Sequence, residues 1–144
     1  MKAFISIKYH ADHRNRERIE AISSALEEGG YQTVCIVRDV EKWGDVQLSP
    51  ETLMARTFEE IDSSDLVVID LTEKGVGVGI EAGYAHASGI PVVVIARKGA
   101  DVSKTLQGIS RAVFWYEGWD ELRELFKEGG AGAGESERAN RRNN

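Results

Sequence analysis

Short runs of apolar and β-branched residues alternate along the chain with longer segments of helical periodicity. This alternation is typical of a parallel sheet with helices on both faces. Right-handed crossovers then favour an α/β protein with a three-layer, flavodoxin-like fold and a five-stranded parallel sheet of order 2-1-3-4-5. The strands are predicted at Ala3–Lys8, Thr33–Arg38, Leu66–Leu71, Val92–Ala96 and Ala112–Tyr116.

Capping residues predict where the helices begin and end. A first helix is expected to begin near Asp12 and to end at the pair Gly29 and Gly30. Ser49, followed by a proline, begins a second helix. The apolar stripe of this helix is predicted to be Leu53, Met54, Phe58 and Ile61. The remaining predicted elements are a helix over Ile80–Ser88, a short turn near Ser103–Ser110 and a final helix over Trp119–Lys127.

The 144 residues of the chain are enough for about one domain. Residues 129–144 have almost no apolar side chains, so they cannot bury enough surface to offset their ordering entropy. We predict a disordered tail there and a single domain over residues 1–128. The formal net charge of −6 argues against a basic nucleic-acid-binding module.

Targeting and metal-binding signals are missing from the sequence. No apolar run approaches the ~20 residues that span a bilayer, and the first ten residues, MKAFISIKYH, resemble a strand more than a signal peptide. We therefore expect no membrane association and a cytoplasmic location. Cys35 lies in an apolar run and is predicted to be a core residue. His10, His13 and His86 show no metal-ligand spacing, so no metal site is expected.

Ligands bind outside the carboxyl ends of the strands in sheets of this type. The residues that follow each predicted strand are therefore candidates for a site. They are Lys8, Tyr9, His10 and His13 after the first strand, Asp39 and Trp43 after the second, Asp70 and Thr72 around the end of the third, and Arg97 and Lys98 after the fourth.

The loop after the third predicted strand begins the sequence KGVGVGIEAGYAHASGIPV. Its alternating glycines, Gly75, Gly77 and Gly79, let a ligand approach the backbone closely. Glu81 is expected in the first turn of the next helix, where the positive end of the helix dipole favours its ionised form. Such a carboxylate can attack the anomeric carbon of a sugar. The alternative to a nucleophile is that Glu81 only stabilises the first turn of the helix and that the glycines only form a tight turn.

The segment DLVVIDLTEKGVGVGIEAGYAHASGIPVVVI resembles the central motif of the nucleoside 2-deoxyribosyltransferase superfamily, which includes the 2′-deoxynucleoside 5′-monophosphate N-hydrolases. The resemblance implies that Glu81 attacks C1′ and that the sugar passes to another base or to water. It implies neither a metal nor an organic cofactor. The residues that fit the motif are Glu81, Gly83, Tyr84, Ala85, Gly89 and Pro91.

The chain also departs from the pattern of this superfamily. Its members usually carry an aspartate in the helix before the third strand, where this chain has Thr57. The monophosphate hydrolases have a serine at the position of Gly75, and they reach across a dimer with a serine that Ser103 matches. The resemblance therefore implies substrate contacts from Gly75 and Ser103 and a homodimer or larger homo-oligomer.

The first loop, KYHADHRNR, replaces a glycine- and serine-rich start in the superfamily. It supplies Lys8 and His10 as candidate anion contacts, with Tyr9 between them. The alternative is a solvated start of a helix. Trp43 could stack on a base or anchor its own loop. Asp70, at the end of the third predicted strand, is a further candidate substrate contact.

Two hypotheses for the function remain, and both predict a nucleoside or nucleotide as the small-molecule partner. The first is an enzyme that cleaves the N-glycosidic bond of a nucleoside or its 5′-monophosphate. The second is a nucleotide-sensing or scaffolding module without turnover, and Thr57 is its main support. A third class, a phosphoacceptor receiver domain, is poorly supported. It would need clustered acids after the first strand and a lysine after the fifth, whereas this chain has KYH and EGW at these two places.

Overall fold

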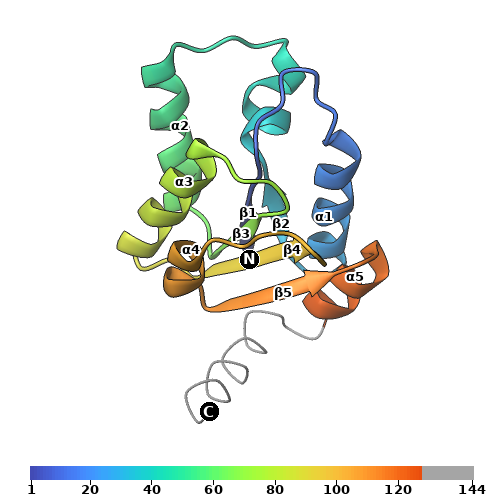
Figure 1. Cartoon of the computed structure of the whole chain (residues 1–144). Helices are drawn as coiled ribbons and strands as arrows, with labels where there is room; N and C mark the ends of the chain where they lie inside the picture. The colour runs from blue at the N-terminus through green and yellow to red at the C-terminus, as the bar shows by residue number, and fades with distance from the viewer. Residues whose placement is uncertain (128–144) are drawn as a thin grey trace.

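Five parallel strands form one sheet in the order β2-β1-β3-β4-β5 (Figure 1), which confirms the predicted fold and topology. The computed structural model describes residues 1–127, so the predicted tail over residues 129–144 lies outside the described residues. The strands are β1 (Lys2–Ser6), β2 (Gln32–Val34), β3 (Leu66–Asp70), β4 (Val92–Arg97) and β5 (Ala112–Tyr116).

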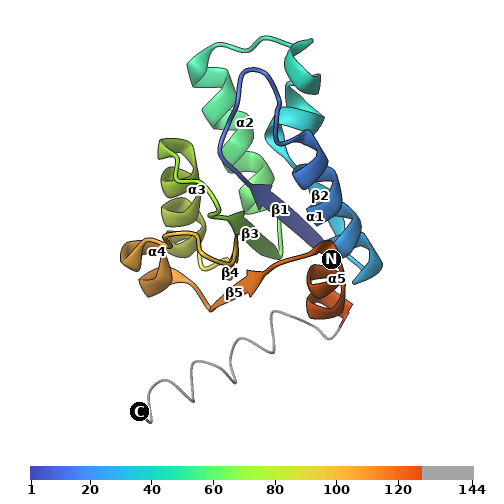
Figure 2. The same ribbon diagram turned by 45° about the vertical axis from the view of Figure 1, so that its right-hand side comes forward.

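Helices cover both faces of the sheet, with α2, α3 and α4 on one face and α1 and α5 on the other (Figure 2). Successive residues of β3 alternate between the two cores, as a strand buried on both faces requires: Val67 and Ile69 pack with the first group, and Leu66 and Val68 with the second. The helices are α1 (Arg16–Glu28), α2 (Pro50–Asp62), α3 (Val76–Ala87), α4 (Lys104–Ile109) and α5 (Trp119–Lys127).

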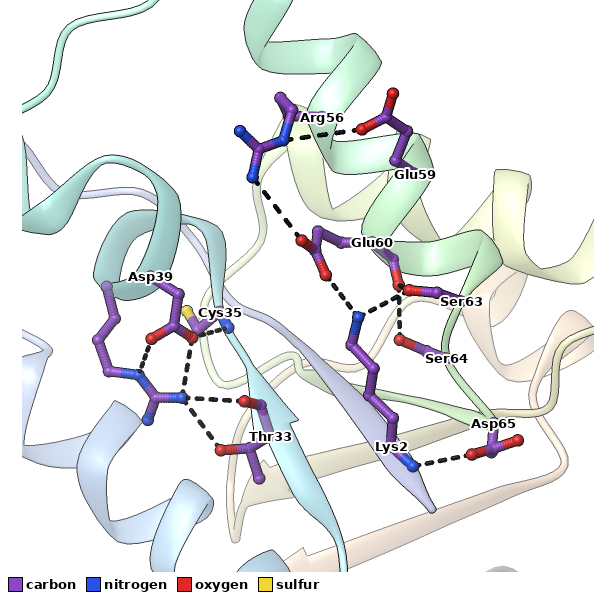
Figure 3. A network of polar contacts seen from close by, with 11 residues as sticks. Lys2, Thr33, Cys35, Asp39, Arg56, Glu59, Glu60, Ser63, Ser64 and Asp65 are labelled. Carbon is purple, nitrogen blue, oxygen red and sulfur yellow. Dashed lines mark hydrogen bonds and ion pairs between the residues drawn. The ribbon is translucent and has the colours of Figure 1, made fainter.

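The second strand is shorter than predicted. Pairing in β2 ends at Val34, and the chain continues as a π-helical turn, η1 (Ile36–Val40), followed by a short 3₁₀ turn, η2 (Lys42–Gly44). The carboxylate of Asp39 stabilises this turn by accepting the backbone N–H of Cys35 at 2.8 Å (Figure 3). A local side chain thus takes over a backbone donor that would otherwise be available to a longer strand.

The start of the first helix also differs from the prediction. Asp12 does not cap it, because the helix begins at Arg16, four residues later. The carboxylate of Asp12 accepts a hydrogen bond from the backbone N–H of Arg14 at 3.2 Å, before the helix begins. Asn15 occupies the cap position, and its side-chain amide donates to the carbonyl of Lys8 at 2.9 Å. Asn15 therefore fastens the loop that follows β1 to the beginning of α1.

The second helix begins as predicted, since the hydroxyl of Ser49 accepts the backbone N–H of Thr52 at 3.2 Å. Its apolar stripe is only partly buried. Ile61 is fully enclosed, whereas Leu53 and Met54 line a cavity. In the part of the chain that the structure describes, none of the helices has the length and apolar character needed to cross a bilayer.

Candidate functional site

A cavity of about 380 Å³ lies at the carboxyl ends of β1 and β2, between α2 and α3. Its walls are largely apolar, with side chains such as Ile7, Ile36 and Met54. This combination of size and apolar walls with a few polar groups is typical of small-molecule sites. The polar and titratable side chains that line it are Lys8, Tyr9, His10, Asn15, Glu41, Thr57 and Glu81.

The predicted glycine loop is in fact the beginning of α3. Gly75 is the cap residue, and the helix starts at Val76, four residues earlier than predicted. Glu81 therefore lies in the second turn and not the first. A β-carbon built at Gly77 would meet no heavy atom within 4 Å, so the space in front of this turn is open.

Glu81 reaches into the cavity and is hydrogen-bonded to the sheet. Its Oε2 accepts a hydrogen bond from the hydroxyl of Ser6, the last residue of β1, which is only 1% exposed. Burial raises the pKa of Glu81 to about 7, and the bond from Ser6 opposes that rise by favouring the carboxylate. The expectation that a helix terminus holds Glu81 ionised was wrong, because burial dominates in the second turn.

Three residues of the first loop lie in the same cavity as Glu81. Nε2 of His10 is 3.0 Å from Oε2 of Glu73, and the other carboxylate oxygen of Glu73 lies 3.8 Å from the guanidinium of Arg18. Tyr9 is 60% exposed at the cavity. Lys8 lines the cavity, and its side-chain ammonium makes no hydrogen bond or ion pair with any residue between 1 and 127. Its ammonium group is thus available to a ligand.

Three of the predicted contacts lie elsewhere. Gly75, Gly79 and Ser103 line a second hollow of about 360 Å³, between the start of α3 and α4. The hydroxyl of Ser103 is 2.6 Å from that of Thr105. Within one chain, therefore, Ser103 is not brought to the cavity that contains Glu81.

Trp43 does not line the cavity. Its ring makes an edge contact with His13 at a centroid distance of 5.6 Å, and the guanidinium of Arg16 lies 4.4 Å from its centroid. These contacts join η2 to the start of α1 and favour the loop-anchor interpretation over base stacking.

Asp70 is 1% exposed and does not line the cavity. Its carboxylate accepts the hydroxyl of Tyr116 at 2.6 Å and the backbone N–H of Thr72 at 2.8 Å. Burial, followed by the charge of Asp70, raises the pKa of Tyr116. In this structure Asp70 joins β3 to β5, which indicates a structural role.

Replacing Tyr116 by phenylalanine is expected to lower the free energy of unfolding by about 1–3 kcal/mol, because it leaves a buried carboxylate with one donor fewer. Tyr84→Phe is the matched control, since the hydroxyl of Tyr84 bonds to Asp62 in an exposed setting. Urea unfolding of the two variants measures the difference. Equal stabilities would contradict a structural role for the Asp70–Tyr116 bond.

Cys35 is buried, as predicted, and burial raises the pKa of its thiol to about 12. A thiol with that pKa stays protonated at neutral pH, so it is a poor nucleophile although it borders the cavity. Among residues 1–127, no three histidine, cysteine, aspartate or glutamate side chains are grouped so that they could hold a metal ion.

Sequence reasoning missed Asn15 and Glu41, which line the cavity, and Ser6, which donates a hydrogen bond to Glu81. Ser6 occupies the carboxyl end of β1, where ligand-binding residues are expected in this type of sheet. That position was the available signal, but the strand was predicted to run to Lys8. Glu41 enters the cavity through the π-helical turn, which the hydrophobic pattern does not indicate.

The architecture and the site define an α/β protein with a partly buried carboxyl group that lines a cavity at the carboxyl edge of a parallel sheet. No family model matches the chain. A protein of Thermofilum pendens, provisionally named 2′-deoxynucleoside 5′-phosphate N-hydrolase 1, is 24% identical to it over 135 residues, which cover 89% of this chain and 92% of that protein.

Solved structures share the fold. The 2-deoxyribosyltransferase of Bacillus psychrosaccharolyticus superposes with a TM-score of 0.70 at 15% identity, covering 85% of this chain and 90% of that one. The Clostridium botulinum CMP N-glycosidase has a TM-score of 0.61 at 21% identity, covering 87% and 97%. Together with the N-hydrolase relative, they confirm the resemblance to the nucleoside 2-deoxyribosyltransferase superfamily.

Proposed function

We propose that the chain is a nucleoside 2-deoxyribosyltransferase-like enzyme that cleaves the N-glycosidic bond of a (deoxy)nucleoside or its 5′-monophosphate. The observation that carries the proposal is the position of Glu81, whose carboxyl group faces a ligand-sized cavity and is held by Ser6. The names of the similar proteins, a deoxyribosyltransferase, an N-hydrolase and an N-glycosidase, support this class of reaction.

In the proposed reaction an oxygen of ionised Glu81 attacks C1′ of the sugar, and the bond from C1′ to the base nitrogen breaks. The product of this step is a glycosyl ester of Glu81 and a free base. Water or a second base then attacks C1′ and releases the carboxylate. Since the pKa of Glu81 is about 7, a substantial fraction is ionised and ready to attack at neutral pH.

The cavity has suitable surroundings for each part of a nucleotide. The open space in front of Gly77 leaves room for a sugar beside Glu81. Apolar walls that include Ile36 and Met54 suit a heterocyclic base. The unpaired ammonium of Lys8 suits an anionic group such as a 5′-phosphate.

We further propose a homodimer or larger homo-oligomer. Ser103 and Gly75 line a second hollow, and neither lines the cavity of Glu81 in their own chain. That arrangement is compatible with a role for Ser103 in the site of a neighbouring subunit.

A second candidate function is a nucleotide-binding or sensing module of the same fold that has no turnover. It is favoured by Thr57, which lines the cavity but has no carboxyl group. The hydroxyl of Thr57 donates a hydrogen bond to the carbonyl of Leu53 at 2.8 Å. This alternative predicts saturable binding of a nucleotide and a rise in melting temperature, without release of free base.

Ser6→Ala is expected to move the rising limb of the pH profile of kcat/KM to higher pH. The hydroxyl of Ser6 stabilises the carboxylate, so its removal raises the pKa of Glu81 further and lowers the ionised fraction at neutral pH. Ser24→Ala, an exposed serine on α1, is the matched control. An unchanged limb in Ser6→Ala would show that the ionisation of Glu81 does not govern the reaction.

A further inference from the structure

Glu41 is a second carboxyl group in the cavity of Glu81. It directly follows the turn η1, on the wall formed by the segment after β2. The carboxyl group of Glu41 makes no hydrogen bond or ion pair with any residue of the described chain. It is therefore an acidic group that faces a ligand-sized space without a protein partner.

Two sets of contacts hold the segment that carries Glu41. On one side, the guanidinium of Arg38 donates to the hydroxyls of Ser23 at 2.7 Å and Thr33 at 3.0 Å, and it pairs with Asp39 at 3.0 Å. Figure 3 shows Asp39 bridging to the backbone of Cys35. The turn before Glu41 is thus fixed to α1 and β2.

The other side of Glu41 is held under backbone strain. Lys42 and Trp43 follow it with φ of 48° and 56°, and His13 in the facing loop has φ of 54°. Such conformations cost free energy for residues other than glycine and concentrate at functional sites. The contacts of Trp43 with His13 and Arg16 stabilise them. The wall carrying Glu41 is therefore built at an energetic cost.

The proposed reaction needs a proton donor at the base. When the bond to C1′ breaks, its electron pair goes to the base nitrogen, and protonation of the base stabilises this leaving group. Other groups of the cavity are less suited. The hydroxyl of Thr57 is committed to Leu53, the thiol of Cys35 is too weak an acid, and Nε2 of His10 is engaged by Glu73.

We propose that Glu41 donates the proton to the leaving base while Glu81 attacks C1′, a role that rests on the proposed function. The step forms one C–O bond and breaks one C–N bond, and the proton of Glu41 goes to the base. In the second step the Glu41 carboxylate takes a proton from the attacking water or incoming base. C1′ leaves Glu81, and both carboxyl groups return to their starting states.

The surroundings of Glu41 favour a proton on it. Burial raises its pKa, while the charge of His13 opposes the rise. Lys8, His10 and Glu81 line the same cavity. Two carboxyl groups that share a cavity but differ in environment can therefore divide the roles of nucleophile and acid.

The test compares leaving groups that differ in their need for a proton. One substrate is the unmodified nucleoside that the wild type cleaves fastest. The others need no protonation of the leaving group. N7-methyl-2′-deoxyguanosine releases a neutral base, and 4-nitrophenyl 2-deoxyriboside releases a stable anion. For Glu41→Gln, we expect kcat/KM to fall by about 10²-fold or more on the first substrate and to stay within a few-fold on the others. Glu41→Asp should restore part of the lost rate.

Glu59→Gln is the matched control, because Glu59 is an acid with a 73% exposed side chain on α2, away from the cavity. Equal losses on all substrates in Glu41→Gln would overturn the proton-donor role, since they would indicate that Glu41 only shapes the cavity. No loss on any substrate would overturn it too. Failure of the wild type to cleave any nucleoside or 5′-monophosphate would refute the proposed function itself.

Discussion

Replacing Glu81 by glutamine is expected to reduce base release by at least about 10³-fold, because an amide cannot form the glycosyl ester. The assay is a chromatographic screen of ribo- and deoxyribonucleosides and their 5′-monophosphates, with and without a second free base. Exchange that requires the second base would identify a transferase, and release into water alone would identify a hydrolase.

Glu124→Gln is the control for this screen, since Glu124 is an exposed acid on α5, remote from the cavity. It should keep the wild-type rate. Full activity in Glu81→Gln would refute the assignment of the nucleophile. Binding without release of base in the wild type would instead support the non-catalytic module, which the departure at Thr57 favours.

Glu81→Gln is also expected to gain stability relative to the wild type as the pH rises. The pKa of Glu81 is about 7 in the folded protein and 4.5 in the reference state, so between these values the folded state binds more protons than the unfolded state. Stability from this group is therefore complete below about pH 4.5 and is lost as the pH rises through about 7. The full loss is on the order of 3 kcal/mol, because one pKa unit corresponds to about 1.4 kcal/mol.

Urea unfolding at about pH 5 and about pH 8 measures this difference. The wild type should lose stability relative to Glu81→Gln between the two conditions, since the glutamine carries no titrating group. Parallel changes in the two proteins would show that Glu81 titrates near its ordinary pKa. A confirmed difference would mean that the carboxylate is kept in the cavity at a cost in stability, as expected of a group retained for chemistry.

The hydrophobic pattern predicted the centre of the fold well and its edges less well. The buried runs of β3 and β4 were placed to within one residue, because strands covered on both faces must be apolar throughout. The edge strand β2 was predicted too long. Its end is set by one hydrogen bond, in which the carboxylate of Asp39 accepts the backbone N–H of Cys35. No periodicity reports such a bond.

The candidate site was predicted in part for similar reasons. Position in the sheet was enough to place Lys8, Tyr9 and His10 together near Glu81. The helical turn through Gly77 and Gly79 was not expected, because glycine has low helix propensity and the pattern resembles a loop. The sequence also contains no spacing that links residues from separate elements, so the bond between Ser6 and Glu81 needed the structure.

The early end of β2 has a consequence for how this protein can vary. Glu81 is hydrogen-bonded to Ser6 on β1, a strand that is paired on both sides, where substitutions disturb the core. The opposite wall, from Cys35 to Glu41, lies beyond the last paired residue of an edge strand, and its length is not fixed by sheet register. Exchanges of Ile36 and Val37 there can change which base fits while Glu81 and Glu41 stay in place. The choice of base can therefore evolve separately from the two carboxyl groups of the reaction.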